Sequence, residues 1–563
     1  MKQLLKEYLG SLGERDELDS LLPELLSHVG MHVYSEPRTR GRQHGVDIAA
    51  AGRFPGDACD KVYLLSVKAH DLTRATWDGG VDTLRSSLNE ITDTYLSQTL
   101  PEEYRNLPKV ICICVGGSIV QQVQDDVNGY IKAQTARFPA LEYQLWDADR
   151  IAGLIEQYYI SERLLIRSIT TKLGRCVALP DEVEYYIANF KDVIKEIFES
   201  GSAARTKDPA FHVICLNLCL AVLLHHGEVA KNVDGVYRAA EIALVASWAH
   251  LKLSDSGCTD RNRRLRAFDR LFNLYVSVGR VYASHITPCL DEPFRFALSV
   301  VGAYDEVDVN LKAFDVLGRL STLALSIDCY QDGLPAGDDK KTSLVAFSGQ
   351  LTDLIVKMTE NVHTLTTPML ESQTFAISAA IRWLIAKDRL DVVNNWIGRL
   401  ANDLLGCVMI RKGFPAINLD YEQLLDHVHD DHEESYVNET WLASELIPYL
   451  LYLAAKLGRK DIFKTLSDVI KVLPRMTLQV WFPDKNVELY YADEQIVRNG
   501  VMLYAFDPTD EKRLIYQIEQ AIGQRPVSFL TGNPSYMGIP YVAFRQALLP
   551  LPPHLWGVGQ CES

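Results

Sequence analysis

Three side chains of complementary chemistry fall at the ends of two strand-like segments near the start of the chain. Ser66 and Lys68 lie two residues apart in an apolar run, so on a strand they share one face. A paired strand would place Asp47 beside them. Carboxylate and hydroxyl oxygens suit a hard divalent cation such as Mg²⁺ or Mn²⁺, and an ammonium group can orient an attacking water or offset developing charge. These residues therefore predict the hydrolysis of a phosphodiester bond.

A basic loop lies just before this set. It carries Arg38, Arg40, Arg42 and His44, and Arg53 follows nearby. Two glycines in the loop let the backbone approach a ligand closely, and arginine side chains bind phosphate oxygens. We expect these residues to bind nucleic acid. The alternative is a charged loop that only faces solvent.

The elements that must position these residues alternate between helix and strand up to about residue 175. Runs rich in β-branched and aromatic residues predict strands, and apolar residues at helical spacing predict helices. The resulting order is α-β-β-β-α-β-α-β-α, a mixed sheet with a hairpin near its start. The predicted strands are 31–35, 46–51, 61–68, 109–115 and 142–146, and the main predicted helices are 4–29, 81–96 and 119–137.

The motif and the order of elements over roughly the first 170 residues resemble the PD-(D/E)XK, restriction-endonuclease-like nuclease superfamily. Asp47 is similar to the strand aspartate of that family, and Lys68 to its catalytic lysine. Glu24, in the helix before the first strand, resembles an acidic residue that many members carry there. The resemblance implies a restriction-endonuclease-like α/β domain that cleaves nucleic acid with Mg²⁺ or Mn²⁺.

Ser66 departs from the family pattern, in which this position is commonly Asp, Glu or Gln. Some members with a Ser-x-Lys motif take a carboxylate from the following helix instead. Asp82, fourteen positions after Lys68, is similar in placement, and Glu90 is the second choice. The resemblance therefore implies a metal site formed by Asp47 and Ser66 with Asp82 or Glu90.

The chain after Pro180 has a different pattern. Amphipathic helical segments follow one another, separated by Gly, Pro and Asp or Asn. We therefore divide the chain into residues 1–175, the nuclease-like domain, and 176–563, an all-α helical array for assembly or regulation. The segments 478–482 and 541–544 are strand-like and could interrupt the array.

Composition limits the function classes. The chain has 563 residues and a net charge of −16, so it is not a general nucleic-acid coat. The eleven cysteines include no Cys-x-x-Cys pair, which indicates buried thiols in a reducing compartment. The best membrane candidate, 213–224, has about half the length that a bilayer requires. We expect a cytoplasmic protein with no membrane association.

Two other patterns have chemical interest. The segment from His427 to His432 spells the HxHxDH motif of metallo-β-lactamase-like hydrolases, but its surroundings are acidic and helical or loop-like. A zinc hydrolase is the resulting alternative, and a polar loop between helices is the interpretation we favour. Gly116 to Ser118 could hold a phosphate at a helix N-terminus, although an ordinary strand-to-helix turn explains it better.

The expected function is a metal-dependent endonuclease, with DNA favoured over RNA as the substrate. A nuclease domain fused to a long helical region resembles effector nucleases of bacterial anti-phage defence. That resemblance implies a homo-oligomer and a HerA-like ring ATPase as partner. The alternative is a catalytically silent nucleic-acid-binding or scaffold protein with a degenerate nuclease fold.

Overall fold

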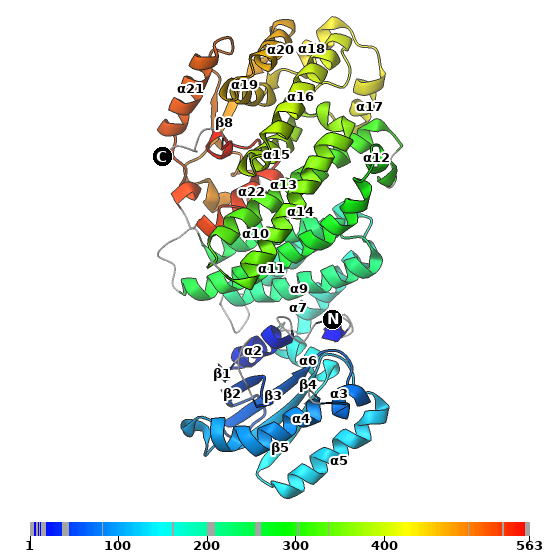
Figure 1. The fold of residues 1–563 in the computed structure, drawn as a ribbon, viewed down its shortest axis with the longest axis vertical. Coiled ribbons are helices and arrows are strands. Elements are labelled where there is room, and N and C mark those ends of the chain that lie inside the picture. The colour runs from blue at the N-terminus through cyan, green and yellow to red at the C-terminus, as the bar shows by residue number, and fades with distance from the viewer. Residues whose placement is uncertain are drawn as a thin grey trace. The chain divides into compact units, whose positions relative to one another are not determined.

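The chain forms two compact units, residues Met1–Asn232 and Val233–Ser563. In Figure 1 the first unit runs from blue to cyan and the second from green to red. The computed structural model describes the chain except residues 1–4, 7–8, 11, 13–17, 36–43, 81–82, 160–162, 200–208, 254–259, 301, 303, 336, 494, 532–533 and 558–563.

A five-stranded mixed sheet forms the centre of the first unit. Its spatial order follows the chain, β1-β2-β3-β4-β5. The pairs β1–β2 and β2–β3 are antiparallel, and β3–β4 and β4–β5 are parallel. The predicted mixed sheet with an early hairpin is therefore confirmed. The strands are β1 His32–Ser35, β2 Ile48–Gly52, β3 Lys61–Lys68, β4 Lys109–Val115 and β5 Leu141–Trp146.

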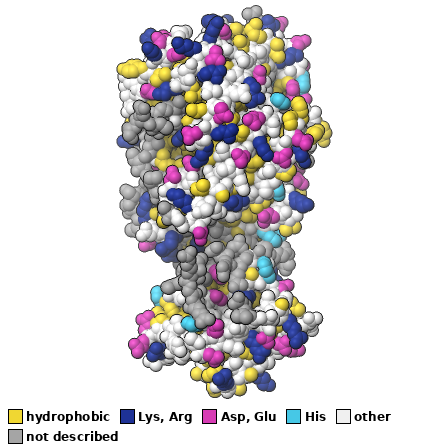
Figure 2. All heavy atoms as spheres, in the orientation of Figure 1, with side chains coloured by type: hydrophobic (Ala, Val, Ile, Leu, Met, Phe, Trp, Pro, Cys, Tyr) yellow, Lys and Arg dark blue, Asp and Glu magenta, His cyan; other side chains and the backbone are white. Residues whose placement is uncertain are grey.

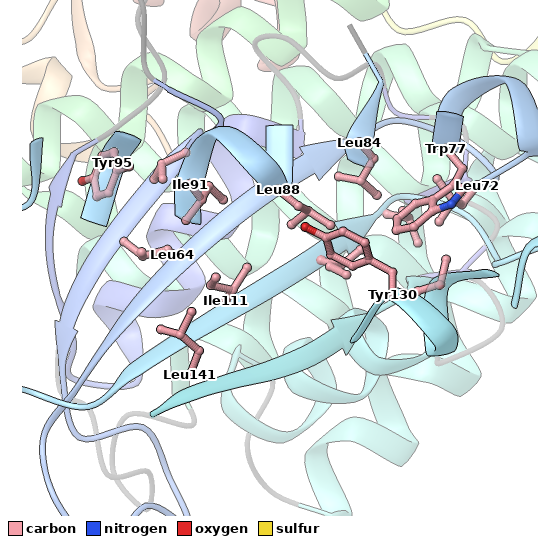
Figure 3. Close-up of a cluster of buried hydrophobic side chains, with 14 of the residues drawn as sticks. Leu64, Leu72, Trp77, Leu84, Leu88, Ile91, Tyr95, Ile111, Tyr130 and Leu141 are labelled. Carbon is pink, nitrogen blue, oxygen red and sulfur yellow. The ribbon is translucent and has the colours of Figure 1, made fainter. Parts of the chain in front are cut away.

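Helices cover both faces of this sheet, and apart from their terminal lysines β3 and β4 are therefore buried. On one face, Leu64 and Ile111 pack against Leu88 and Ile91, as Figure 3 shows. On the other face, the ring of Tyr63 packs against the rings of Phe54 and Trp146, and α2 contacts β1 and β2. The helices of this α/β part are α2 Asp19–His28, α3 Arg74–Asp78, α4 Leu84–Glu90, α5 Gln121–Arg137 and α6 Ala148–Leu154, with π-helical segments η2 Ile91–Thr99 and η4 Ile155–Tyr159.

The predicted helix at 81–96 is thus two elements. The α-helix α4 begins at Leu84 and continues as the wider π-helix η2 from Ile91. Both Ile91 and Tyr95 remain buried in the same core as Leu84 and Leu88. The apolar spacing predicts which side chains face the core, but it does not predict the change of helix type.

Three further helices complete the first unit: α7 Arg163–Ala178, α8 Val183–Glu199 and α9 Pro209–Ala230. They contact one another and belong to the same compact unit as the sheet, whose boundary falls at Asn232 rather than at residue 175. By length and composition α9 alone among the described helices could cross a membrane, and 56% of its apolar window is buried inside the protein. A core helix that is apolar on all sides has the same composition.

The second unit is largely helical, as predicted. Two small strand pairs interrupt it, β6 Ala443–Ser444 with β7 Thr477–Leu478, and β8 Val480–Pro483 with β9 Gly500–Leu503. Its helices are α10 Asp234–Leu251, α11 Arg261–Ile286, α12 Arg295–Ser299, α13 Glu306–Asp332, α14 Asp339–Asn361, α15 Thr374–Ala386, α16 Leu390–Ile410, α17 Tyr421–His429, α18 Glu434–Thr440, α19 Leu446–Lys456, α20 Lys460–Val472, α21 Glu511–Gln524 and α22 Ile539–Gln546.

Helix α13 is the centre of this unit. It packs against α14 and α15, and also against α22 from the C-terminal region, which returns to contact α10 as well. A linear repeat array has contacts between neighbouring repeats only, so this return differs from such an array. The segment 541–544, predicted as strand-like, lies inside α22 with all four residues buried. That prediction is wrong because a short apolar run has the same pattern in a buried strand and a buried helix.

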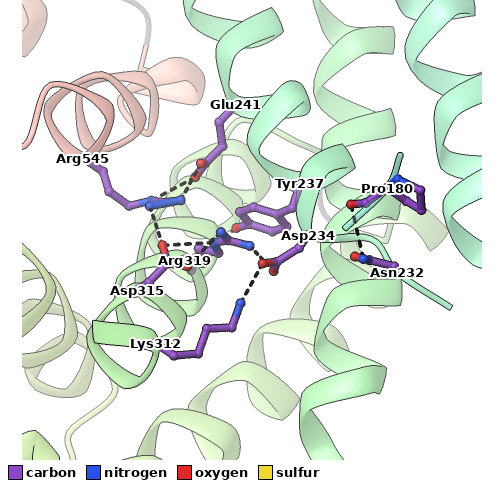
Figure 4. A network of polar contacts seen from close by, with 9 residues as sticks. All are labelled: Pro180, Asn232, Asp234, Tyr237, Glu241, Lys312, Asp315, Arg319 and Arg545. Carbon is purple, nitrogen blue, oxygen red and sulfur yellow. Dashed lines mark hydrogen bonds and ion pairs between the residues drawn. The ribbon is translucent and has the colours of Figure 1, made fainter. Parts of the chain in front are cut away.

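A buried network of charges joins α10, α13 and α22 (Figure 4). Arg319 lies 2.6 Å from a carboxylate oxygen of Asp234 and 2.8 Å from one of Asp315. Arg545 lies 2.6 Å from Glu241, and Lys312 lies 2.7 Å from Asp234. Burial by itself would raise the pKa of Asp234, but the positive charges of Arg319 and Lys312 outweigh it and lower the pKa to about 2. Three acids and three bases thus balance within the unit.

Candidate functional site

Asp47 lies at the point where β2 begins and is fixed against β3. Its backbone N–H donates to the carbonyl of Leu65 at 2.9 Å, although Ile48 is the register partner of Leu65. Two consecutive residues therefore oppose one, as in a β-bulge, a feature that re-aims side chains near functional sites. The Asp47 carboxylate accepts a hydrogen bond of 2.7 Å from the N–H of Val67. It takes the position of a strand carbonyl and lies against the backbone between Ser66 and Lys68.

Ser66 and Lys68 occupy the end of β3. Ser66 is fully buried, and its hydroxyl has no hydrogen-bond partner among the described residues. Lys68 is half-buried and is the last residue of the strand. Strand alternation places both side chains on one face of the sheet. The structure therefore brings Asp47, Ser66 and Lys68 to the same end of one pair of strands.

A buried thiol shares this end of the sheet. Cys114 of β4 is the register partner of Val67, the residue that donates to Asp47. Burial raises the pKa of the Cys114 thiol, and the negative charge of Asp47 raises it further. Cys114 is therefore a neutral, inert thiol.

The turn before Asp47 packs against α4. His44 and Gly45 both have positive φ, 50° and 78°. A Cβ atom at Gly45 would lie 2.0 Å from the carbonyl oxygen of Ser87, so only glycine allows the turn to approach α4 this closely. The helix that follows β3 is thus held directly beside the segment that carries Asp47.

The backbone amides of the turn after β4 form hydrogen bonds within the protein. The N–H groups of Gly116 and Gly117 donate to the carbonyls of Lys68 and His70 at 3.0 and 2.8 Å. The N–H of Ser118 donates to the Asp71 carboxylate at 2.7 Å. These amides hold the loop after β3 in place. The turn therefore acts as an ordinary strand-to-helix connection, and its amides are not directed at a phosphate.

The remaining predicted residues lie in different places. Glu90, the last residue of α4, is exposed, and Glu24 is half-buried in α2. Arg53 is exposed, and its guanidinium donates to the carbonyl of Ala58. The other predicted site residues, Asp82 and the loop arginines Arg38, Arg40 and Arg42, lie outside the described residues.

The three histidines of the zinc alternative have their rings engaged in contacts with other residues. His427 is buried, with hydrogen bonds from its ring nitrogens to the Phe414 carbonyl at 2.8 Å and the Tyr436 hydroxyl at 3.2 Å. His429 pairs with Asp305 at 2.7 Å, and the His432 ring stacks on Tyr436. In the described part of the chain, no group of three or more His, Cys, Asp or Glu side chains is arranged to hold a metal ion. His427 and His429 lie in the last turn of α17, and only 430–433 form the connection to α18, so the expected loop between helices covers only the second half of the segment.

Surface charge does not favour a broad polyanion interface. On the face shown in Figure 2, Lys and Arg side chains are interspersed with Asp and Glu. The net charge is −16. Any contact with phosphate groups must therefore be local.

Comparison with known proteins gives no match: no family model, curated protein sequence or solved structure is similar to the chain.

Proposed function

We propose that the first unit is a metal-dependent nuclease that hydrolyses phosphodiester bonds, with DNA as the favoured substrate. The observation that carries the proposal is the hydrogen bond from the Val67 N–H to the Asp47 carboxylate. This bond fixes an acid against the strand end that presents Ser66 and Lys68. The order of elements around it, a hairpin followed by a parallel crossover, supports the same proposal.

The side chains at this end are compatible with a hard cation. The Asp47 carboxylate supplies one oxygen ligand, and the unpartnered, fully buried Ser66 hydroxyl supplies another. Mg²⁺ or Mn²⁺ bound there would neutralise a phosphate and make a bound water more acidic. Lys68 contributes a positive charge beside the scissile phosphate and orients the attacking water. A further carboxylate from Asp82 or Glu90 would complete the ligands.

The acidic helical region 176–563 is proposed to regulate or assemble the nuclease. Residues 1–175 carry 20 Lys and Arg against 24 Asp and Glu, which leaves 57 − 20 = 37 against 73 − 24 = 49 for the rest. Residues 176–563 are therefore the less suitable partner for a polyanion and the better surface for protein contacts. A homo-oligomer and a HerA-like ATPase partner in anti-phage defence remain part of the proposal.

The test compares Mg²⁺-dependent cleavage of DNA by the wild-type protein and by Asp47→Ala and Lys68→Ala. We expect each substitution to reduce the rate at least about 100-fold, since each removes a group that stabilises the transition state. Lys61→Ala is the matched control, because Lys61 lies at the other end of β3 and pairs with Asp57 and Glu142. Equal activity in all four proteins would exclude this site.

Ser66 favours one competing function, a nucleic-acid-binding protein without catalysis. A serine in place of an acid weakens metal binding, since it supplies no negative charge. This alternative predicts no turnover by the wild-type protein in Mg²⁺ or Mn²⁺. It also predicts salt-sensitive DNA binding that is lost with Arg40→Ala or Arg42→Ala.

A further inference from the structure

A small buried cavity lies in the second unit, remote in sequence from the proposed nuclease site. Helices α15 and α19 and the segments 480–481 and 550–556 surround it. Its volume is about 10 Å³, which is room for a single water molecule or monatomic ion. The lining is mainly apolar and aromatic, so its few polar atoms determine what it can hold.

These polar atoms come from two pairs of residues, each one helical turn apart. Thr374 and Ser378 lie on α15, and Glu445 and Tyr449 lie at the start of α19. Thr374 is 3% exposed and Tyr449 is 1% exposed. Neither hydroxyl has a hydrogen-bond partner among the described residues. A buried polar group without a partner is unfavourable. We therefore expect the cavity to hold an occupant that interacts with these hydroxyl oxygens.

Charge narrows the choice of occupant. The Glu371 carboxylate lies next to Glu445 and accepts hydrogen bonds from the N–H groups of Glu445 and Leu446, at 2.6 and 2.8 Å. The Trp441 indole N–H and the Ser444 hydroxyl also donate hydrogen bonds to the Glu371 carboxylate. Within the described part of the chain, neither Glu371 nor Glu445 forms an ion pair. The donors satisfy Glu371, while the Glu445 carboxylate lines the cavity without a counter-charge.

We propose that this cavity is a binding site for a monovalent metal cation, Na⁺ or K⁺, held by the Glu445 carboxylate and the hydroxyls of Thr374 and Tyr449. One carboxylate balances one positive charge. Mg²⁺ keeps several of its water ligands in proteins, and a space for one particle excludes them. A lone water would satisfy the hydroxyls but would leave the Glu445 carboxyl protonated near neutral pH, because burial raises its pKa to about 8, whereas a bound cation stabilises the ionised carboxylate. The cation ties α15 to α19 and thereby stabilises the second unit.

Thermal unfolding of the full-length protein tests the site. The melting temperature is measured in NaCl, KCl and choline chloride at equal ionic strength, since choline is too large for the cavity. We expect one of the two metal salts to raise the Tm of the second unit by about 2–4 °C over choline. Glu445→Gln and Tyr449→Phe should abolish this difference. Glu422→Gln, an exposed acid of α17, should retain it.

Diffraction gives a second readout that does not depend on the variants. Crystals grown in a rubidium or thallium salt should show an anomalous peak between Glu445, Thr374 and Tyr449. The same Tm in all three salts would overturn the proposal, and so would ordinary water density with no anomalous peak if KCl is the stabilising salt. Both results are independent of nuclease activity, so they leave the function of the first unit untouched.

Discussion

For Ser66, the nuclease proposal and protein stability favour different side chains: metal binding favours the hydroxyl, and stability favours its removal. Its hydroxyl is buried and has no partner among the described residues. Removal of such a group relieves a desolvation penalty. We therefore expect Ser66→Ala to raise the free energy of unfolding by about 1 kcal/mol in metal-free buffer. Chemical denaturation measures this change.

The same substitution should weaken metal-dependent cleavage if the hydroxyl is a ligand. We expect a higher Mg²⁺ concentration for half-maximal activity in Ser66→Ala, with the fold unchanged by circular dichroism. Ser86→Ala, on the nearby helix α4, is the control. Unchanged magnesium dependence together with a more stable protein would show that Ser66 is only a buried polar residue.

Glu445 predicts a dependence of stability on pH. Burial raises its pKa from 4.5 to about 8, and the charge of Glu371 adds to the increase. When folding raises the pKa of an acid, the protein loses stability as the pH rises from the pKa of the unfolded state to the pKa of the folded state. In choline buffer the wild-type protein should therefore become less stable between pH 4.5 and about 8.

Glu445→Gln should remove most of this dependence. Relative to wild type, the variant should be similar near the lower limit of this range and more stable above pH 8 by about 1–2 kcal/mol. Unfolding in urea at each pH gives the comparison. The same pH profile in both proteins would show that Glu445 stays ionised in the folded state.

The residues of the candidate site show what sequence can predict. Asp47, Ser66 and Lys68 were predicted to meet at a strand end, and the structure places them there, because alternation and pairing follow from local pattern. The bulge at Asp47 has no such pattern, since it depends on how two strands are registered. The close approach of Gly45 to Ser87 also cannot be predicted from local sequence, because it forms only when α4 packs against the turn before Asp47.

At the scale of elements, the charge network predicts which contacts hold the second unit together. Arg319 is 2% exposed and lies between Asp234 and Asp315. Removal of one partner from a buried network leaves uncompensated charge. Arg319→Met should lower the free energy of unfolding by about 3–5 kcal/mol.

Arg459→Met provides the contrast, because Arg459 pairs with Asp461 at the surface. Such exposed pairs contribute about 0–1 kcal/mol. Denaturant titration of both variants should therefore give a large loss for Arg319→Met and little for Arg459→Met. Similar losses would indicate that the network contributes no more than a surface pair.

The contribution of this network to stability is lost at low pH. The pKa of Asp234 falls from 3.8 to about 2 in the folded protein. Its contribution is therefore present above pH 3.8 and is lost as the pH falls toward 2.

Elements differ in how well the sequence predicts them. The bounds of β3 and β4 were predicted as observed, since both are long apolar runs rich in β-branched residues. The segment 541–544 has a similar composition yet is helical, because its partners are helices α10 and α13. Its surroundings, which come from sequence about 200–300 residues away, decide the outcome.

At the scale of the whole molecule, the boundary at Asn232 predicts which fragment folds alone. Helix α7 packs against α8, and the Cys176 thiol contacts the Tyr186 carbonyl at 3.5 Å. A fragment that ends at residue 175 cuts α7 and exposes Ile169 and Leu173, which are buried in the full chain. We expect residues 1–232 to be monodisperse and residues 1–175 to aggregate. Size-exclusion chromatography distinguishes them, and two monodisperse fragments would place the boundary before α7.

Arg545, in α22, binds Glu241 in the first helix of the second unit, 304 residues earlier. During translation, Glu241 leaves the ribosome long before its hydrogen-bonded counter-charge exists. We therefore expect the second unit to complete its folding only after Arg545 has left the ribosome, whereas the first unit can fold before that point. A stop codon introduced just before Arg545 would then produce an intact first unit joined to an unfinished second one.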